Sequence, residues 1–223
     1  MIAADEFQAC YPISLLLQGS TSFFAAEESL VTISTVLDHA CAANVTSCAT
    51  YLADVATNLT KTENCGDDYD GGTSTVVDAY MGLVAYQVVY SATCLKNDDT
   101  SAYCFGDAVT NSTDPTETYF YFLPLNSTLP GSTVPNCGSC LQDTMSIYHV
   151  ATANRKQPIA NTYVSAAQDV DVICGPTFAN TTLAEAMTTS GAFSALRQGS
   201  WSSSSPWLLI VTTSAVLAMS WLM

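Results

Sequence analysis

Apolar residues recur at steps of three and four along most of the chain, a spacing that predicts amphipathic helices. Ser22 is suited to cap the first of them. The stripe at 76–94 is the widest and most hydrophobic, and it predicts a central helix covered on more than one side, which starts at a capping-box-like Thr75. The five stripes cover residues 22–41, 48–59, 76–94, 140–148 and 163–174.

Three segments interrupt this helical pattern. Residues 66–72 are rich in glycine and aspartate and predict a loop. Residues 97–135 form a long insert, whose aromatic run Tyr119–Leu123 predicts a strand or an extended segment that fills the core. Residues 188–206 have the composition of a Ser/Thr-rich linker.

The predicted fold is therefore all-α. We expect a disulfide-stapled bundle of about five helices with one long, partly extended insert, followed by a C-terminal hydrophobic tail. The domain organisation is a cysteine-rich helical domain at 1–187, the linker at 188–206 and the tail at 207–223.

The tail, Trp207 to Met223, has no charged residue and no basic cluster after it. A membrane span needs about 20 apolar residues, so this segment is barely long enough. Small residues, a polar spacer and a terminal apolar tail form the pattern of a GPI-attachment signal, with Ser190 or Ser202 as the attachment residue. A single transmembrane anchor and a tail-anchored cytosolic protein are the alternatives; the latter arises because residues 1–7 lack the features of a leader.

The chain has nine cysteines. An odd number cannot pair completely, and we expect Cys10 to be the unpaired one, its partner lying with the leader upstream of this sequence; a free or intermolecular thiol is the alternative. The sequence does not fix the connectivity, and the preferred local pair is Cys94–Cys104, which closes a short loop after the central helix. The expected disulfide partners are Cys41, Cys48, Cys65, Cys94, Cys104, Cys137, Cys140 and Cys174.

Five N-x-[S/T] sequons accompany the cysteines, and together they indicate the oxidising secretory pathway. Each predicts an exposed asparagine, because a glycan cannot be buried. The predicted N-glycosylation sites are Asn44, Asn58, Asn111, Asn126 and Asn180. The net charge of −15, from 20 acidic and 5 basic residues, excludes a nucleic-acid partner.

Motifs for catalysis are absent, and the sequence identifies no catalytic, cofactor-binding or metal-binding residue. Cys137-Gly-Ser-Cys140 could be a redox or zinc motif, although structural disulfides are the better interpretation. The aspartates at 67, 68 and 70 fail the calcium-loop register and read as a solvated turn. His39 and His149 fit no catalytic pattern, and nothing selects a pair of carboxylates for glycoside cleavage.

A set of short motifs in fixed order is similar to an uncharacterised family of fungal secreted, cysteine-rich proteins that usually carry a leader and a GPI signal. The resemblance implies a fungal cell-surface protein and supplies no catalytic residue. The motifs are YPISLLLQ (11–18), SFF (22–24), AYMGLVAYQ (79–87), CLK (94–96), YCF (103–105), AVTNS (108–112), YFLPL (121–125), CGSCLQ (137–142), TYVSAAQ (162–168) and CGP (174–176).

The sequence thus favours a glycoprotein of the plasma-membrane outer face or the cell wall, anchored by lipid or by the C-terminal helix, with a structural or recognition role. Its partners would be the membrane and a cell-wall glycan. An anchored carbohydrate-active enzyme acting on cell-wall glycan is the alternative. A further one is a single-pass protein that binds a small apolar ligand between its helices.

Overall fold

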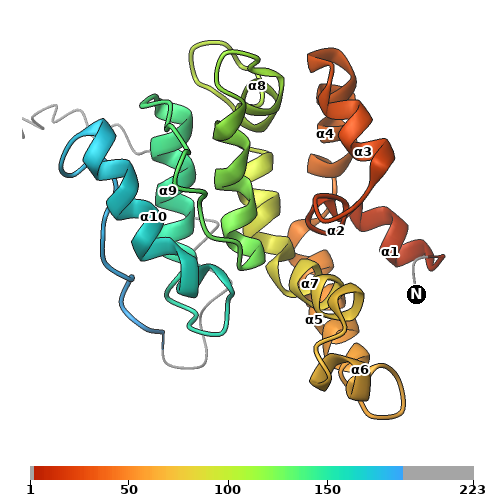
Figure 1. Ribbon diagram of the computed structural model, residues 1–223. Coiled ribbons are helices and arrows are strands. Elements are labelled where there is room, and N and C mark those ends of the chain that lie inside the picture. The colour runs from red at the N-terminus through yellow and green to blue at the C-terminus, as the bar shows by residue number, and fades with distance from the viewer. Residues whose placement is uncertain (1–2, 188–223) are drawn as a thin grey trace, which may run out of the picture.

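A computed structural model describes residues 3–187, and this part of the chain is helical without β-strands (Figure 1). The all-α prediction is confirmed, with more and shorter helices than expected. The helices are α1 (Asp5–Cys10), α2 (Ile13–Leu16), α3 (Thr21–Glu27), α4 (Leu30–Cys41), α5 (Val45–Leu59), α6 (Gly66–Asp70), α7 (Ser74–Thr93), α8 (Cys104–Thr110), the 3₁₀ helix η1 (Pro115–Leu125), α9 (Ser139–Ala151) and α10 (Ile159–Cys174).

The first predicted helix is divided into two. α3 ends at Glu27, and α4 begins at Leu30 because the backbone of Ser29 is extended, with φ −137° and ψ 122°. Ser20, not Ser22, caps α3: its hydroxyl accepts a hydrogen bond from the backbone N–H of Phe23 at 3.3 Å. The break lets α3 fold back against α4.

Helix α7 is central, as predicted, and packs against α2, α4, α5, α8, α9 and η1. It begins at Ser74, and the predicted capping box at Thr75 is wrong, since the N-cap is Thr73. α2 crosses α7 so closely that a Cβ atom on Gly82 would lie 2.9 Å from the carbonyl oxygen of Ser14. The buried residues of α7 are Gly82, Leu83, Ala85, Tyr86, Val88, Val89, Ala92 and Thr93.

Two hydrophobic clusters meet on α7. The smaller joins α1, α5 and α7 through residues such as Phe7, Leu52 and Leu83. The larger contains residues of α2, α3, α4, α7, α8, η1, α9 and α10. Helices α1–α4 therefore lie on one side of the molecule and α9 and α10 on the other, with α7 between them (Figure 1).

The insert and the predicted loop are both more helical than expected. The aromatic run lies in η1, where Glu117, Phe120 and Leu123 are buried at the three-residue spacing of a 3₁₀ helix. The core-filling prediction is confirmed, whereas the extended conformation is wrong. The loop at 66–72 contains α6, which begins where the backbone of Lys61 approaches Gly66 too closely for a side chain.

Four disulfides cross-link the helices, and each joins residues 36 to 53 positions apart. The local pair Cys94–Cys104 is wrong, because Cys94 is bonded to Cys41 of α4 and Cys104 to Cys140 of α9, at Cα–Cα distances of 5.6 and 5.4 Å. The pairs are Cys10–Cys48, Cys41–Cys94, Cys104–Cys140 and Cys137–Cys174.

The unpaired cysteine is Cys65, not Cys10. α1 packs on α5 and brings the Cα atoms of Cys10 and Cys48 to 5.5 Å. Residues 3–187 include all nine cysteines, and among them only Cys65 is free. Cys65 is half-buried and follows the C-terminal end of α5, whereas Cys48 lies near the N-terminal end of that helix. The odd cysteine number is therefore no indication of a missing partner for Cys10.

Residues 175–187 lie across α9 and α10. The backbone N–H of Ala184 donates to the hydroxyl of Thr152 at 2.9 Å, and that of Met187 donates to the carbonyl of Ala153 at 3.1 Å. The predicted linker and tail, 188–223, lie outside the described residues. Within 3–187, no helix is long and apolar enough to cross a membrane.

Candidate functional site

An open groove of about 630 Å³ lies between α1, α2, α3 and α4. Ligand sites in proteins commonly measure about 300–1,000 Å³, so the groove has the size of a small-molecule site. Its apolar lining consists of Phe7, Pro12, Leu16, Phe23, Ala26 and Val36. Its polar lining consists of Gln8, Tyr11, Ser20, Ser22 and Thr32.

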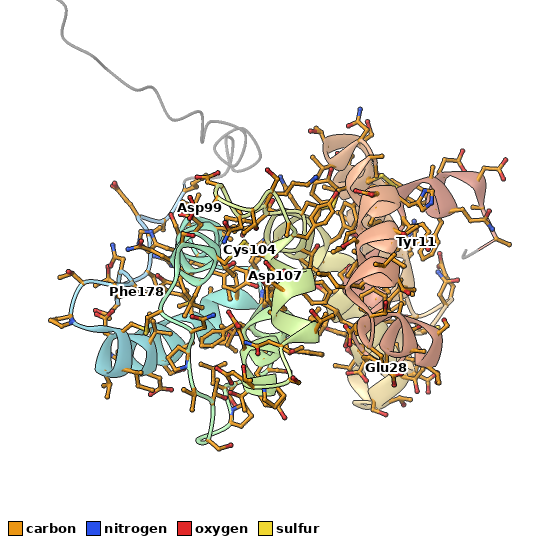
Figure 2. All side chains as sticks on the ribbon, turned by 90° about the horizontal axis from the view of Figure 1, so that it is seen from above. Tyr11, Glu28, Asp99, Cys104, Asp107 and Phe178 are labelled. Atoms are coloured by element: carbon orange, nitrogen blue, oxygen red, sulfur yellow. A yellow bond between two sulfur atoms is a disulfide. The ribbon has the colours of Figure 1, made fainter. Side chains whose placement is uncertain are left out.

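Local backbone geometry shapes this groove. Tyr11 closes α1 in the left-handed conformation, at φ 41°, and so turns the chain into α2. Tyr11 is 39% exposed, and its ring centroid lies 6.4 Å from that of His39. Figure 2 shows Tyr11 and Glu28 on this side of the molecule, with Phe178 on the opposite side. The groove is therefore remote from the C-terminal end of the described chain.

A smaller hollow of about 170 Å³ lies between η1, the loop 129–135 and α10. Asp169 is its one carboxylate, and the groove on α1–α4 has none. Glycoside cleavage uses two carboxyl groups about 5–9.5 Å apart across the substrate. Neither space offers such a pair, so neither favours the carbohydrate-active alternative.

Glu117 is a buried carboxyl group that the sequence did not single out, although its three-residue spacing from Phe120 could have revealed it. Burial raises its pKa; hydrogen bonds from the side chains of Asn136 and Asn111 oppose the rise, and nearby Asp114 and Asp107 add to it. Glu117 lines neither of the two spaces. We therefore interpret it as part of the packing of the insert.

Glu27 is another carboxyl group with a displaced pKa. Burial raises its pKa to about 7, and its Oε1 atom is buried without a hydrogen-bond partner. It ends α3, one residue after Ala26, which lines the groove. A group with this pKa is about half ionised at neutral pH, which makes the stability of this end of the molecule dependent on pH.

The C-x-x-C motif is structural. Cys137 bonds to Cys174 on α10, and Cys140 bonds to Cys104 on α8. Figure 2 shows Cys104 near the middle of the molecule. Because each sulfur is bonded to a distant partner, the two cysteines do not form the internal pair that a thioredoxin-type motif requires.

The remaining candidate residues do not gather. His39 lies near Tyr11, whereas His149 packs 5.8 Å from the Tyr163 ring, where burial lowers its pKa. The aspartates at 67, 68 and 70 lie on α6 rather than in a loop. Within the described residues, no group of three or more His, Cys, Asp or Glu side chains could hold a metal ion.

Four of the five sequon asparagines are exposed: Asn44, Asn58, Asn126 and Asn180. Asn44 caps α5 through its Oδ1 atom, which leaves its amide nitrogen for a glycan. Asn111 is half-buried and hydrogen-bonds Glu117, so it is the least accessible. The attachment candidates Ser190 and Ser202 lie outside the described residues.

Comparisons with known proteins identify a family whose function is not described. No curated protein and no solved structure matches the chain. The family model that matches residues 1–183 carries the description "Domain of unknown function (DUF7729)". It covers the described helical domain almost completely, including all four disulfides. The chain therefore belongs to the DUF7729 family of domains of unknown function.

Proposed function

We propose that this chain is the ectodomain of a GPI-anchored, N-glycosylated protein of the fungal cell surface or cell wall, with a structural or recognition role. The observation that carries this proposal is the set of four long-range disulfides, which use eight of the nine cysteines. Such cross-linking is typical of oxidising, extracellular compartments.

Two further features support an outward-facing domain. Four sequon asparagines are exposed at element ends or on helix surfaces, as a glycan attachment site requires. The net charge of −15 keeps such a domain soluble and repels anionic lipid headgroups. The helical domain would then stand away from the bilayer and be held by its tail alone.

The anchor is tested by producing the full chain behind an added secretory leader and treating the cells with phosphatidylinositol-specific phospholipase. We expect release of the protein, together with a fall in mass after enzymatic removal of N-glycans. Ser190→Leu and Ser202→Leu form a matched pair that identifies the attachment residue, since a large side chain there blocks transfer. Retention on the membrane after treatment would favour a transmembrane helix instead.

A recognition role is favoured over catalysis because the two spaces contain no carboxylate pair and no nucleophile–base pair. Glycan-array binding of the released protein tests whether a cell-wall glycan is the partner. Turnover of a glucan or chitin oligomer by the same preparation would contradict the proposal and support the enzyme alternative.

A further inference from the structure

We propose that the groove between α1, α2, α3 and α4 binds one small, uncharged, mainly hydrocarbon molecule. This inference goes beyond the surface role proposed above and depends neither on the anchor nor on the glycans. It follows from the shape, the charge and the accessibility of the groove.

The groove is preformed, because both hydrophobic clusters contribute to its floor. Phe7 belongs to the smaller cluster and is 8% exposed, whereas Phe23 belongs to the larger and is 3% exposed. Leu16 and Val36 are half-buried between them. The Cys10–Cys48 disulfide fixes α1 against α5. Binding of a ligand would therefore order few additional side chains, and this low entropic cost favours binding to the apolar floor.

The charge of the surrounding chain selects against anions. Residues 1–60 contain no lysine or arginine, and the segment that forms the groove carries the acidic residues Asp5, Glu6, Glu27, Glu28 and Asp38. Among the described residues, the lining contains no lysine or arginine with which the carboxylate of a fatty acid or the phosphate of a phospholipid could pair. The lining itself contains no carboxylate either, so a cationic ligand would form no ion pair with it.

The polar groups of the lining suit a neutral ligand with one hydroxyl or carbonyl group. Ser20, Ser22 and Thr32 offer hydroxyls, and Gln8 offers a side-chain amide. These groups can donate or accept, so they can satisfy a hydroxyl at one end of a hydrocarbon body. This combination of an apolar floor and a few polar groups is usual in small-molecule sites.

The groove also stays open in the glycosylated protein. None of its four helices carries a sequon, and the first sequon, Asn44, follows α4. Glycans on the other exposed asparagines would extend from α5, from the end of η1 and from the segment after α10. The walls of the groove are therefore free of attached sugar.

Two fluorescent probes with one skeleton test the proposal. N-phenyl-1-naphthylamine is neutral, and 8-anilino-1-naphthalenesulfonate adds one negative charge to the same rings. We expect the full chain, secreted from a leader fusion, to bind the neutral probe saturably at one site and the sulfonate at least about tenfold more weakly. Hexadecanol should displace the neutral probe at lower concentration than palmitate does.

Two variant pairs on α4 locate the site. Thr32→Glu places a carboxylate in the lining, whereas Thr35→Glu places it on an exposed position one turn along the same helix. Val36→Trp fills the groove, whereas Val31→Trp adds the ring at a position that is 78% exposed. Binding of the neutral probe should fall at least about tenfold in the first member of each pair and less than about twofold in the second.

Equal binding of the two probes, equal loss in both members of a pair, or absence of saturable binding would overturn the proposal. A doubling of the mass with concentration that the neutral probe reverses would show instead that a second copy of the chain occupies the groove. Release by phospholipase does not depend on these variants, so failure of the groove and failure of the anchor are distinguishable.

Discussion

Replacing Gly82 with alanine tests the close crossing of α2 and α7. The added Cβ would lie 2.5 Å from Leu15 Cδ2, 2.9 Å from Gln18 Nε2 and 2.9 Å from the Ser14 carbonyl oxygen. The leucine methyl can rotate away, but the carbonyl belongs to the backbone of α2 and moves only with the helix.

The magnitude follows from opposing contributions. Alanine in a helix interior is about 1 kcal/mol more favourable than glycine. Overpacking of a buried contact costs about 1–3 kcal/mol. A shift of α2 also strains the hydrogen bond from Gln18 Nε2 to the Asp78 carbonyl, now 2.7 Å long, at a cost of about 1 kcal/mol. We therefore expect Gly82→Ala to lower the free energy of unfolding by about 1–3 kcal/mol.

Gly106→Ala on α8 is the matched control. Its added Cβ would meet Leu30 Cδ1 at 3.3 Å, and Leu30 is a flexible side chain that is 42% exposed. We expect this variant to be neutral or up to about 1 kcal/mol more stable. Urea unfolding of the oxidised full chain, followed by circular dichroism, gives both values from the transition midpoint at constant slope. A Gly82→Ala protein as stable as the parent would refute the reasoning about the α2–α7 crossing.

Three further predictions concern side chains and sulfur. The Glu27 carboxyl binds its proton more tightly in the folded chain, with a pKa of about 7 against the usual 4.5, so the free energy of unfolding should fall as the pH rises from 4.5 to 7. Allowing for partial exposure, we expect Glu27→Gln to recover about 1–2 kcal/mol at pH 8 and to flatten that dependence in urea titrations; an unchanged pH profile would contradict this. Tyr148→Phe removes a buried hydroxyl without a hydrogen-bond partner, so the variant should be as stable as the parent or more stable. Tyr163→Phe removes a 2.7 Å hydrogen bond to the Asn180 carbonyl and should lower the free energy of unfolding by about 1 kcal/mol in the same assay. The opposite order of stability would show that the Tyr148 hydroxyl has a partner. Replacing Cys41 and Cys94 together by serine opens a loop of 53 residues and should cost up to about 4 kcal/mol, measured as a lower unfolding midpoint; no change would mean that the bond is absent from the native protein.

Periodicity predicted much of the fold. The stripes at 48–59, 140–148 and 163–174 correspond to α5, α9 and α10, and the widest stripe is the central α7. Leu30 belongs to the first predicted stripe, yet it is 42% exposed because the helix is interrupted at Ser29. That break depends on how α3 packs back on α4, and single-sequence periodicity carries no such tertiary information.

The cysteine pairing and the groove could not be predicted for the same reason. Cys10 and Cys48 meet because α1 packs on α5, and nothing local to either residue records that contact. The groove takes Phe7, Leu16, Phe23 and Val36 from four helices. Phe7 and Leu16 precede the first predicted stripe, and only the angle between the helices places them with Phe23 and Val36 around a common open space.

The most direct test of the central claim, an oxidised helical domain stapled across long sequence separations, is peptide mapping of the native protein. The protein is alkylated without reduction, digested with chymotrypsin and analysed by mass spectrometry. The structure predicts alkylation at Cys65 alone and linked peptides for Cys10–Cys48, Cys41–Cys94, Cys104–Cys140 and Cys137–Cys174. Alkylation of all nine cysteines, or a linked Cys137–Cys140 peptide, would contradict it.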